Sequence, residues 1–383
     1  MLIKNENKLK IIVVGISLVI FTILLLVARS GENASLLMTH YAEDGITPLG
    51  VHFVPGVIVD YELTSPTEHT PFYQQLLSVE ILSGDLEGIV AGIDHIQVNP
   101  RFPHYGVGDQ VIVILNEITD TLMIYNPNRT NVLIGFVVAF LALLCIIGGK
   151  RGAMSVLGLI FSLSSIVWIL VPLTLQGHSP IIIALIVAIL IILVIITLMA
   201  GVNSKSIVAI LGCVFGVVSA ALLAFIVGSL SFITGYHTSA AGTLSLLENV
   251  NLSGIFVSGV IISAMGAIMD TTMSIASSME EIKRASPSIS STQLFKAGLN
   301  IGRDIMGTMS NTLILAFVGS SLGLLLIIFA SEVSFLQFIN YDDIGVEIIQ
   351  GIAGSIGIVL SVPFTTFIAS KLFTYKKSEN ISE

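Results

Sequence analysis

Residues 181–202 read IIIALIVAILIILVIITLMAGV, an apolar run that no charged side chain interrupts. As a helix this run would extend about 33 Å at 1.5 Å per residue, which crosses the roughly 30 Å hydrocarbon core of a bilayer. Apolar residues make up 54% of the chain and charged residues only 11%, whereas about a quarter of a soluble domain is charged. The sequence therefore predicts an α-helical membrane protein.

Seven further runs of this kind predict an eight-span polytopic topology. They cover residues 11–28, 132–147, 155–175, 207–233, 252–276, 305–330 and 348–370. The second of the eight is long enough to cross only if Gly148 and Gly149 extend it. The first exceeds the roughly 7–15 apolar residues of a secretory signal, so an uncleaved anchor helix is expected.

The basic residues orient this topology. Thirteen of the 16 Lys and Arg residues fall on one side, and Arg29, Arg101 and Arg129 fall on the other. Because Lys and Arg near helix ends resist translocation, the basic side is expected to be cytoplasmic. Both termini are then cytoplasmic in a plasma membrane, with residues 29–131 outside. Eighteen of the 25 acidic residues lie on the outer side, which argues against nucleic acid as a partner.

Residues 29–131 have a different pattern. Short alternating or β-branched runs at residues 57–59, 77–81, 88–93, 111–114 and 122–125 predict strands. Residues 83–85 and 106–109 predict turns, because Gly supplies positive φ and Asp can bond its own backbone. Such a segment is typical of a small extracytoplasmic β-barrel-like domain. The expected parts are an N-terminus and anchor at 1–28, this domain at 29–131, a seven-span domain at 132–370 and a cytoplasmic tail at 371–383.

Asp270 is the most costly residue of the predicted spans. It lies about 24 Å along its helix from Gly254, and an acid at that depth requires a partner, water or a proton. Asn311 lies about 28 Å from Ala330 on the next span, so the two are expected at similar depth. The polar site predicted at the cytoplasmic ends of spans six and seven comprises Asp270, Ser274, Arg303, Asp304, Thr308 and Asn311.

Two interpretations of this cluster remain open. Arg303 could reach Asp270 and clamp two helices together as a purely structural pair. Alternatively, Asp270 could be a protonatable or cation-coordinating group in a cytoplasm-facing vestibule.

Small residues recur at helical spacing in three spans. The stripes are Ser155-Gly158-Ser162-Ser165, Gly212-Gly216-Ser219 and Gly259-Ser263-Gly266. Small residues allow close helix packing in lipid, which is the favoured interpretation, and a polar conduit lined by the serines is the alternative.

Several resemblances to catalytic motifs fail on context. Residues 319–323 read GSSLG but lie in an apolar run expected to be helical, whereas a nucleophile elbow needs a strand-to-helix turn. The seven histidines match no zinc pattern, and Cys145 and Cys213 lie in apolar runs where they suit small packing residues. The sequence predicts no enzyme, no cofactor, no metal site and no catalytic residue.

Two motifs identify a resemblance. Residues 265–278, MGAIMDTTMSIASS, and residues 302–316, GRDIMGTMSNTLILA, resemble signatures of the YibE/F family of bacterial membrane proteins. The resemblance extends over the whole chain and implies one anchor, a β-rich outer segment and seven spans. It implies no particular activity, but Asp270, Ser274, Arg303, Asp304, Asn311 and Thr312 match its motifs.

Two classes of function fit these features. The first is a transporter or exporter of a small solute or ion, using the polar site and drawing on an ion gradient. The alternative is a non-transporting membrane scaffold or sensor that acts through its outer β domain. The expected partners are the lipid bilayer and a paralogous membrane subunit or further copies of the chain.

Overall fold

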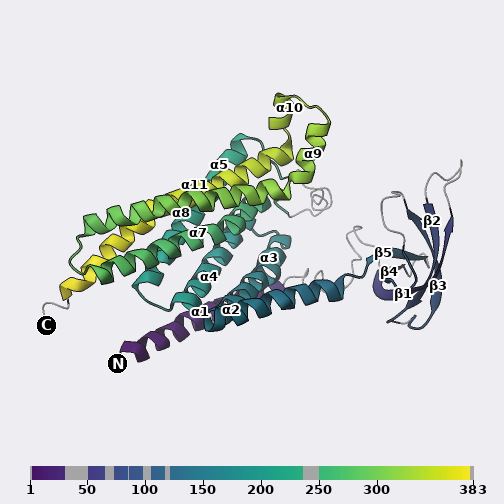
Figure 1. The fold of residues 1–383 in the computed structure, drawn as a ribbon, viewed down its shortest axis with the longest axis horizontal. Coiled ribbons are helices and arrows are strands. Elements are labelled where there is room, and N and C mark those ends of the chain that lie inside the picture. The colour runs from purple at the N-terminus through teal and green to yellow at the C-terminus, as the bar shows by residue number, and fades with distance from the viewer. Residues whose placement is uncertain are drawn as a thin grey trace. The chain divides into compact units, whose positions relative to one another are not determined.

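The computed structural model describes residues 2–30, 51–64, 73–84, 86–97, 105–116, 121–235 and 250–379. Two compact units divide the chain. One unit, Met1–Ala34 with Leu144–Glu383, is helical, and the other, Ser35–Leu143, contains a β-sheet. Figure 1 shows both sets of elements, and each unit is described on its own.

The helical unit is built around α7. Its elements are α1 (Leu2–Ser30), α2 (Thr130–Ser165, shared with the other unit), the π-helical turn η2 (Ile166–Leu170), α3 (Val171–Leu175), α4 (Pro180–Ala200), α5 (Ser204–Leu230), α7 (Leu252–Ala285), α8 (Ser291–Ser320), α9 (Leu322–Ala330), α10 (Phe335–Ile339) and α11 (Asp342–Glu379). Helix α7 contacts α4, α5, α8 and α11 (Figure 1). The apolar core therefore lies along α7, with Ile261, Ile268 and Ile275 fully buried.

Helix length and composition identify part of the eight expected spans. In the described part of the chain, five helical stretches are long and apolar enough to cross a membrane, and α8 with α9 makes a sixth if the bent pair is one span. Residues Val13–Val27 of α1 form a shorter apolar helix. The stretch Thr130–Leu175 counts once although it has 46 residues, about 69 Å of helix.

Gly149 interrupts this long stretch. Its backbone has φ 54° and ψ −132°, which is not helical, and such a positive φ costs glycine little. Three residues later, a Cβ at Gly152 would collide with the carbonyl oxygen of Leu144. The chain therefore changes direction sharply here, between the second and third expected spans.

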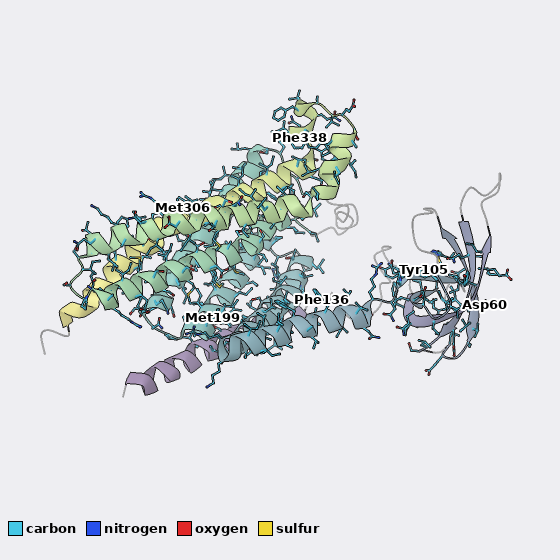
Figure 2. All side chains as sticks on the ribbon, in the orientation of Figure 1. Asp60, Tyr105, Phe136, Met199, Met306 and Phe338 are labelled. Carbon is cyan, nitrogen blue, oxygen red and sulfur yellow. The ribbon has the colours of Figure 1, made fainter. Side chains whose placement is uncertain are left out.

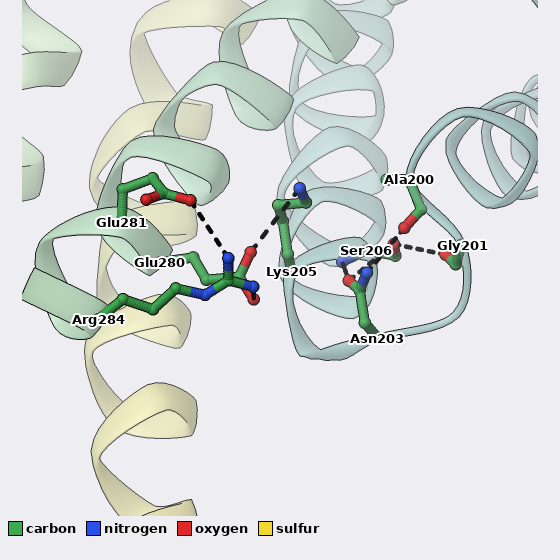
Figure 3. Close-up of polar contacts among 8 residues, drawn as sticks. All are labelled: Ala200, Gly201, Asn203, Lys205, Ser206, Glu280, Glu281 and Arg284. Atoms are coloured by element: carbon green, nitrogen blue, oxygen red, sulfur yellow. Dashed lines mark hydrogen bonds and ion pairs between the residues drawn. The ribbon is translucent and has the colours of Figure 1, made fainter. Parts of the chain in front are cut away.

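The two ends of the α7–α8 connection are sharply defined. Pro287 lies between the helices, and Ser290 caps α8 in a capping box with Gln293. At the same end of α7, Glu280 lies 3.7 Å from Lys205 and 3.3 Å from Arg284, and Glu281 lies 3.4 Å from Arg284 (Figure 3).

Most of the predicted tail at residues 371–383 belongs to α11, which continues to Glu379. Residues 380–383 lie outside the described part.

Two of the small-residue stripes pack helices together. Gly212 and Gly216 of α5 lie against α11, where a Cβ at Gly216 would come within 2.9 Å of Ser361 Cβ. Gly158 lies against Ile195 of α4. The Ser162 hydroxyl donates to the carbonyl four residues earlier in its own helix, which favours packing over a serine-lined conduit.

The motif at residues 319–323 does not continue one helix as expected. Helix α8 ends at Ser320 and α9 begins at Leu322, with a bend of 60° between them. Ser321 stands at the break with φ −96° and ψ 9°. The two glycines favour this interruption because glycine has weak helix propensity. The two serines favour it because their hydroxyls can bond local backbone.

The other unit contains a five-stranded antiparallel sheet. Its strands are β1 (Val51–Thr64), β2 (Tyr73–Ile81), β3 (Val90–Gln97), β4 (Gln110–Asn116) and β5 (Thr121–Pro127), in the order β3-β2-β1-β4-β5. The sheet curls so that the two edge strands β3 and β5 approach each other. Its core comprises Ile58, Leu77, Val79, Ile93, Val111 and Val113.

Four of the five expected runs lie entirely in these strands, and the run at 88–93 begins two residues before β3. The turn at residues 106–109 is also confirmed, with φ 91° at Gly108 and the Asp109 carboxylate accepting a 2.8 Å hydrogen bond from the Gly106 amide. At the other expected turn Gly84 has φ 89°, whereas Asp85 lies outside the described part, as do residues 31–50 and 65–72.

We expect residues 29–131, expressed alone, to fold as a soluble β domain. The sheet has its own apolar core, and sheets of three or more strands with such a core can be stable independently. Far-ultraviolet circular dichroism should give a β spectrum with cooperative urea unfolding. A coil spectrum would contradict an independently folding unit.

The stability of this domain is expected to decrease below about pH 6.5. His95 on β3 contacts the Tyr105 ring edge-to-face at 5.2 Å, and burial lowers the pKa of His95 from its ordinary 6.5. Since the folded state disfavours the charged imidazole, stability is full above the unfolded pKa and is lost as pH falls through the folded pKa.

A His95→Phe variant is the matched control for that prediction, because it keeps a ring against Tyr105 and does not titrate. Between pH 7.5 and pH 5, the urea midpoint of residues 29–131 should fall further for the parent segment than for the variant. Equal decreases in the two proteins would show that His95 does not cause the effect.

Candidate functional site on helices α7 and α8

Asp270 lies on the exposed side of α7. Ser263, Gly266 and Ser274 share this side and are also exposed, as 3.6-residue periodicity requires. The opposite side, which includes Ile268 and Thr272, is fully buried. In the third small-residue stripe nothing lies within 4 Å of a Cβ at Gly266, and a Cβ at Gly259 would lie 3.6 Å from the Gln350 side chain, so the stripe makes no tight helix contact in the described structure. It leaves a polar surface around Asp270.

The surface continues toward an apolar groove. Gly259, one turn before Ser263, lines a groove of about 380 Å³ that α7 forms with η2 and α3. Its walls include Ile166, Leu170, Ile255 and Ile262. One exposed side of α7 thus runs from an apolar groove at its N-terminal half to a carboxyl group at Asp270.

Asp270 lies well inside the apolar part of α7. Ten residues separate it from Glu280, about 15 Å along the helix. Because Glu280 belongs to the charged group with Lys205 and Arg284, a bilayer edge at that level puts Asp270 near the middle of a ~30 Å core.

Contacts between α7 and α8 give their register. A Cβ at Gly302 would lie 3.4 Å from Ile275, and one at Gly298 would meet Met279. In these antiparallel helices Asp270 is consequently level with Gly307, and Asn311 is level with Gly266. Asn311 therefore lies about one turn, or 6 Å, from the level of Asp270.

The remaining predicted site residues lie on α8, and all of them are exposed. Arg303 donates a 3.4 Å hydrogen bond to Asn300 of its own helix. The Thr308 hydroxyl donates to the Ile305 carbonyl at 2.8 Å and accepts nothing from α7 in the described contacts. Among the described residues no ion pair or hydrogen bond joins Asp270 to Arg303, so the structure gives no support to the clamp.

The arrangement places two carboxylates on neighbouring helices. Asp304 is about one turn from the level of Asp270, and Thr308 is adjacent to that level on the same exposed side of α8. Carboxylate and hydroxyl oxygens are hard ligands that suit a proton or a small cation. In the part of the chain that the structure describes, no three His, Cys, Asp or Glu side chains cluster closely enough to hold a metal.

Sequence reasoning missed a second carboxyl group in the helical unit. Glu347 of α11 accepts a 2.5 Å hydrogen bond from the Ser321 hydroxyl at the α8–α9 break. Its position, at the edge of the last apolar run, suggested an exposed loop residue. The paired glycines around Ser321 were the available signal, since they mark a helix interruption.

The long apolar helices of this chain suggest a helical membrane protein. The sequence model of the YibE/F-like protein family matches residues 136–375, which is more than half of the chain. The chain belongs to the YibE/F-like family. The match covers α4, α5, α7, α8 and α9 entirely and therefore includes every predicted site residue. Comparisons with curated proteins and with solved structures gave no match.

Proposed function

We propose that this protein transports or exports a small solute or ion across the plasma membrane, using the α7–α8 surface. The observation that carries the proposal is the exposed position of Asp270 in an apolar helix. A carboxyl group at membrane depth costs a few kcal/mol unless it has a partner, water or a proton. Since Asp270 forms no ion pair among the described residues, we propose water, a proton or a transported ion as its partner.

Helix interruption within the membrane domain supports the same proposal. The α8–α9 pair bends by 60° at Ser321. Irregular backbone at membrane depth is tolerated where protein or a water-filled cavity covers it, and discontinuous helices recur at the binding sites of secondary transporters. With no described domain that resembles a nucleotide-binding module, an ion gradient or downhill movement is the proposed energy source.

The transport proposal is tested with the purified chain in proteoliposomes. Gradients of H⁺, Na⁺ and K⁺ are imposed one at a time, and internal pH and membrane potential are recorded. A flux that saturates with ion concentration and exceeds that of protein-free liposomes is expected for at least one ion. Rates equal to those of protein-free liposomes under all three gradients, with and without added solutes, would contradict the proposal.

We also propose the eight-span topology, with both termini in the cytoplasm and residues 29–131 outside. The Gly149 break divides a stretch that is about twice as long as one span needs, and residues 132–140, which are apolar apart from Gly135, are exposed and suit lipid contact. The apolar residues Val13–Val27 of α1 supply the first span. The 13-to-3 division of basic residues sets the orientation.

Single-cysteine labelling should confirm this topology. In a background with Cys145→Ser and Cys213→Ala, a Val107→Cys variant is expected to react with an impermeant reagent from outside only. A Ser286→Cys variant, in the α7–α8 connection, should react from the cytoplasmic side only. Both native positions are exposed, so access does not limit labelling. Reaction at position 107 from the cytoplasmic side alone would contradict the proposed orientation.

A further inference from the structure

An apolar pocket lies where α8, α9, α10 and α11 meet. It has a volume of about 260 Å³. Its apolar walls come from Ile314, Val318, Leu325, Phe338, Ile344 and Ile352. Phe338, labelled in Figure 2, belongs to the short helix α10. The pocket lies at the other end of α8 from the α7–α8 connection and is distinct from the Asp270 surface.

One carboxyl group enters this pocket. Glu347 and Ser321 both line it, and the Glu347 carboxylate accepts a 2.5 Å hydrogen bond from the Ser321 hydroxyl. The second carboxylate oxygen, Oε2, is enclosed and has no hydrogen-bond partner. The break between α8 and α9 therefore positions Ser321 so that it holds one oxygen of Glu347 and leaves the other free.

An enclosed carboxylate oxygen without a partner is costly in apolar surroundings. Among the described residues, no Lys, Arg or His forms an ion pair with Glu347. A ligand that carries a positive charge and a hydrogen-bond donor would supply what Oε2 lacks. Charge complementarity therefore selects a cation.

We propose that this pocket binds a small organic monocation, an ammonium group on an apolar body. The ammonium would donate to Glu347 Oε2, and the apolar body would lie against the isoleucine, valine and leucine walls. The Phe338 ring adds a surface that attracts cations. The mixture of mostly apolar walls and one polar group is typical of small-molecule sites.

An inorganic cation fits this chemistry less well. Alkali and alkaline-earth cations take several oxygen ligands, whereas Glu347 and Ser321 are the pocket residues with side-chain oxygens. Seven of the remaining pocket residues are Ile, Val, Leu or Phe, and they offer no side-chain oxygen. An organic cation uses these apolar walls, which a bare metal ion does not.

This inference rests on the proposed transport function and adds a substrate class to it. An organic cation bound at Glu347 and an ion bound at Asp270 would occupy two separate sites on α8 and its neighbours. With two sites, the gradient of the ion that binds at Asp270 can drive the movement of the organic cation that binds at Glu347. Binding can be measured without any transport, so the two proposals can fail separately.

The test is calorimetric titration of the full chain in nanodiscs, with empty nanodiscs subtracted. The probes are 2-phenylethylammonium and its neutral counterpart 2-phenylethanol. The amine is expected to bind saturably, and Glu347→Gln should weaken its binding at least about 10-fold, because the variant removes the charged partner of a buried pair. Binding of the alcohol should be weak and unchanged by the variant. Glu281→Gln, at an exposed position of α7 outside both sites, should leave amine binding unchanged.

A second variant keeps the test decisive if Glu347→Gln does not fold. Val318→Trp fills the pocket from a side chain that is 44% exposed, so the fold has room for it, and amine binding should be lost. Equal binding of amine and alcohol, insensitive to both variants, would identify a lipid-filled groove and overturn the inference. Binding of Na⁺ without binding of the amine would overturn it in favour of an inorganic cation.

Outcomes for the two proposals are distinguishable. Glu347-dependent amine binding without flux in proteoliposomes would remove the transport function and leave the binding site. Flux without Glu347-dependent amine binding would leave the transport function and remove the site.

Discussion

A Gly216→Leu substitution in α5 should destabilise the helical unit by about 3 kcal/mol or more. A Cβ at this position would lie 2.7 Å from Ile268 Cγ2, 2.9 Å from Ser361 Cβ and 3.0 Å from the Gly357 carbonyl oxygen. Overpacking a tight core typically costs about 1–3 kcal/mol. Here the upper end is expected, because one obstacle is backbone that cannot rotate away.

Gly266→Leu on the exposed side of α7 is the matched control. Nothing lies within 4 Å of a Cβ at Gly266, and both substitutions replace a helical glycine, so the gain in helix propensity is the same. Thermal unfolding in detergent should show a large decrease in melting temperature for Gly216→Leu and little change for Gly266→Leu. Similar melting temperatures for the two variants would contradict the packing of α5 against α7 and α11.

An Asp270→Asn variant should fold normally but lose ion-coupled flux. The amide keeps the shape of the side chain and cannot titrate or carry the negative charge. Flux in proteoliposomes should fall at least about 100-fold, the lower end of what a positioned acid–base group contributes. The melting temperature should change little, because Asp270 forms no ion pair with described residues and lies on an exposed side of α7.

Two further variants sharpen that result. Asp270→Glu keeps the charge and should retain measurable flux, whereas Asp304→Asn tests whether the second carboxylate is also required. If Asp270→Asn lowers expression and stability while the folded fraction transports at the parent rate, Asp270 is structural. That result would remove it from the transport site.

Much of the fold could be predicted from local sequence. Gly106, Gly108 and Asp109 fixed a turn because positive φ and a short carboxylate suit that backbone. Ser290 begins α8 by the same kind of local chemistry, because it caps the helix in a capping box with Gln293. Gly212 and Gly216 predicted a close helix crossing, because small residues bring membrane helices together. These features depend on residues within about one turn of each other.

Features that depend on distant residues were predicted less well. The two helices extend beyond the apolar runs, because α7 continues to Ala285 and α8 starts at Ser291. Helix register is set by side-chain contacts such as Ile275 with Gly302, which the sequence of one span does not contain. In that register Asn311 is level with Gly266, about one turn from Asp270.

The pocket at Glu347 shows the same limitation more strongly. Glu347 and Ser321 are 26 positions apart in the sequence, and neither is unusual in its own segment. Only the bend between α8 and α9 brings the hydroxyl to the carboxylate. A helix interruption could be predicted from the glycines at 319 and 323, whereas the side chain that meets it could not.

Water access to the exposed side of α7 tests the central claim most directly. Cysteines at Ser263, Gly266, Asp270 and Ser274 are compared in a membrane with cysteines at Leu222 and Phe225, which are exposed apolar positions of α5. We expect an impermeant thiol reagent to modify the α7 positions and to leave the two α5 positions unmodified, because a polar path must contain water. Absence of reaction at all four α7 positions, as at the α5 controls, would show that Asp270 faces lipid or protein and would contradict the transport site.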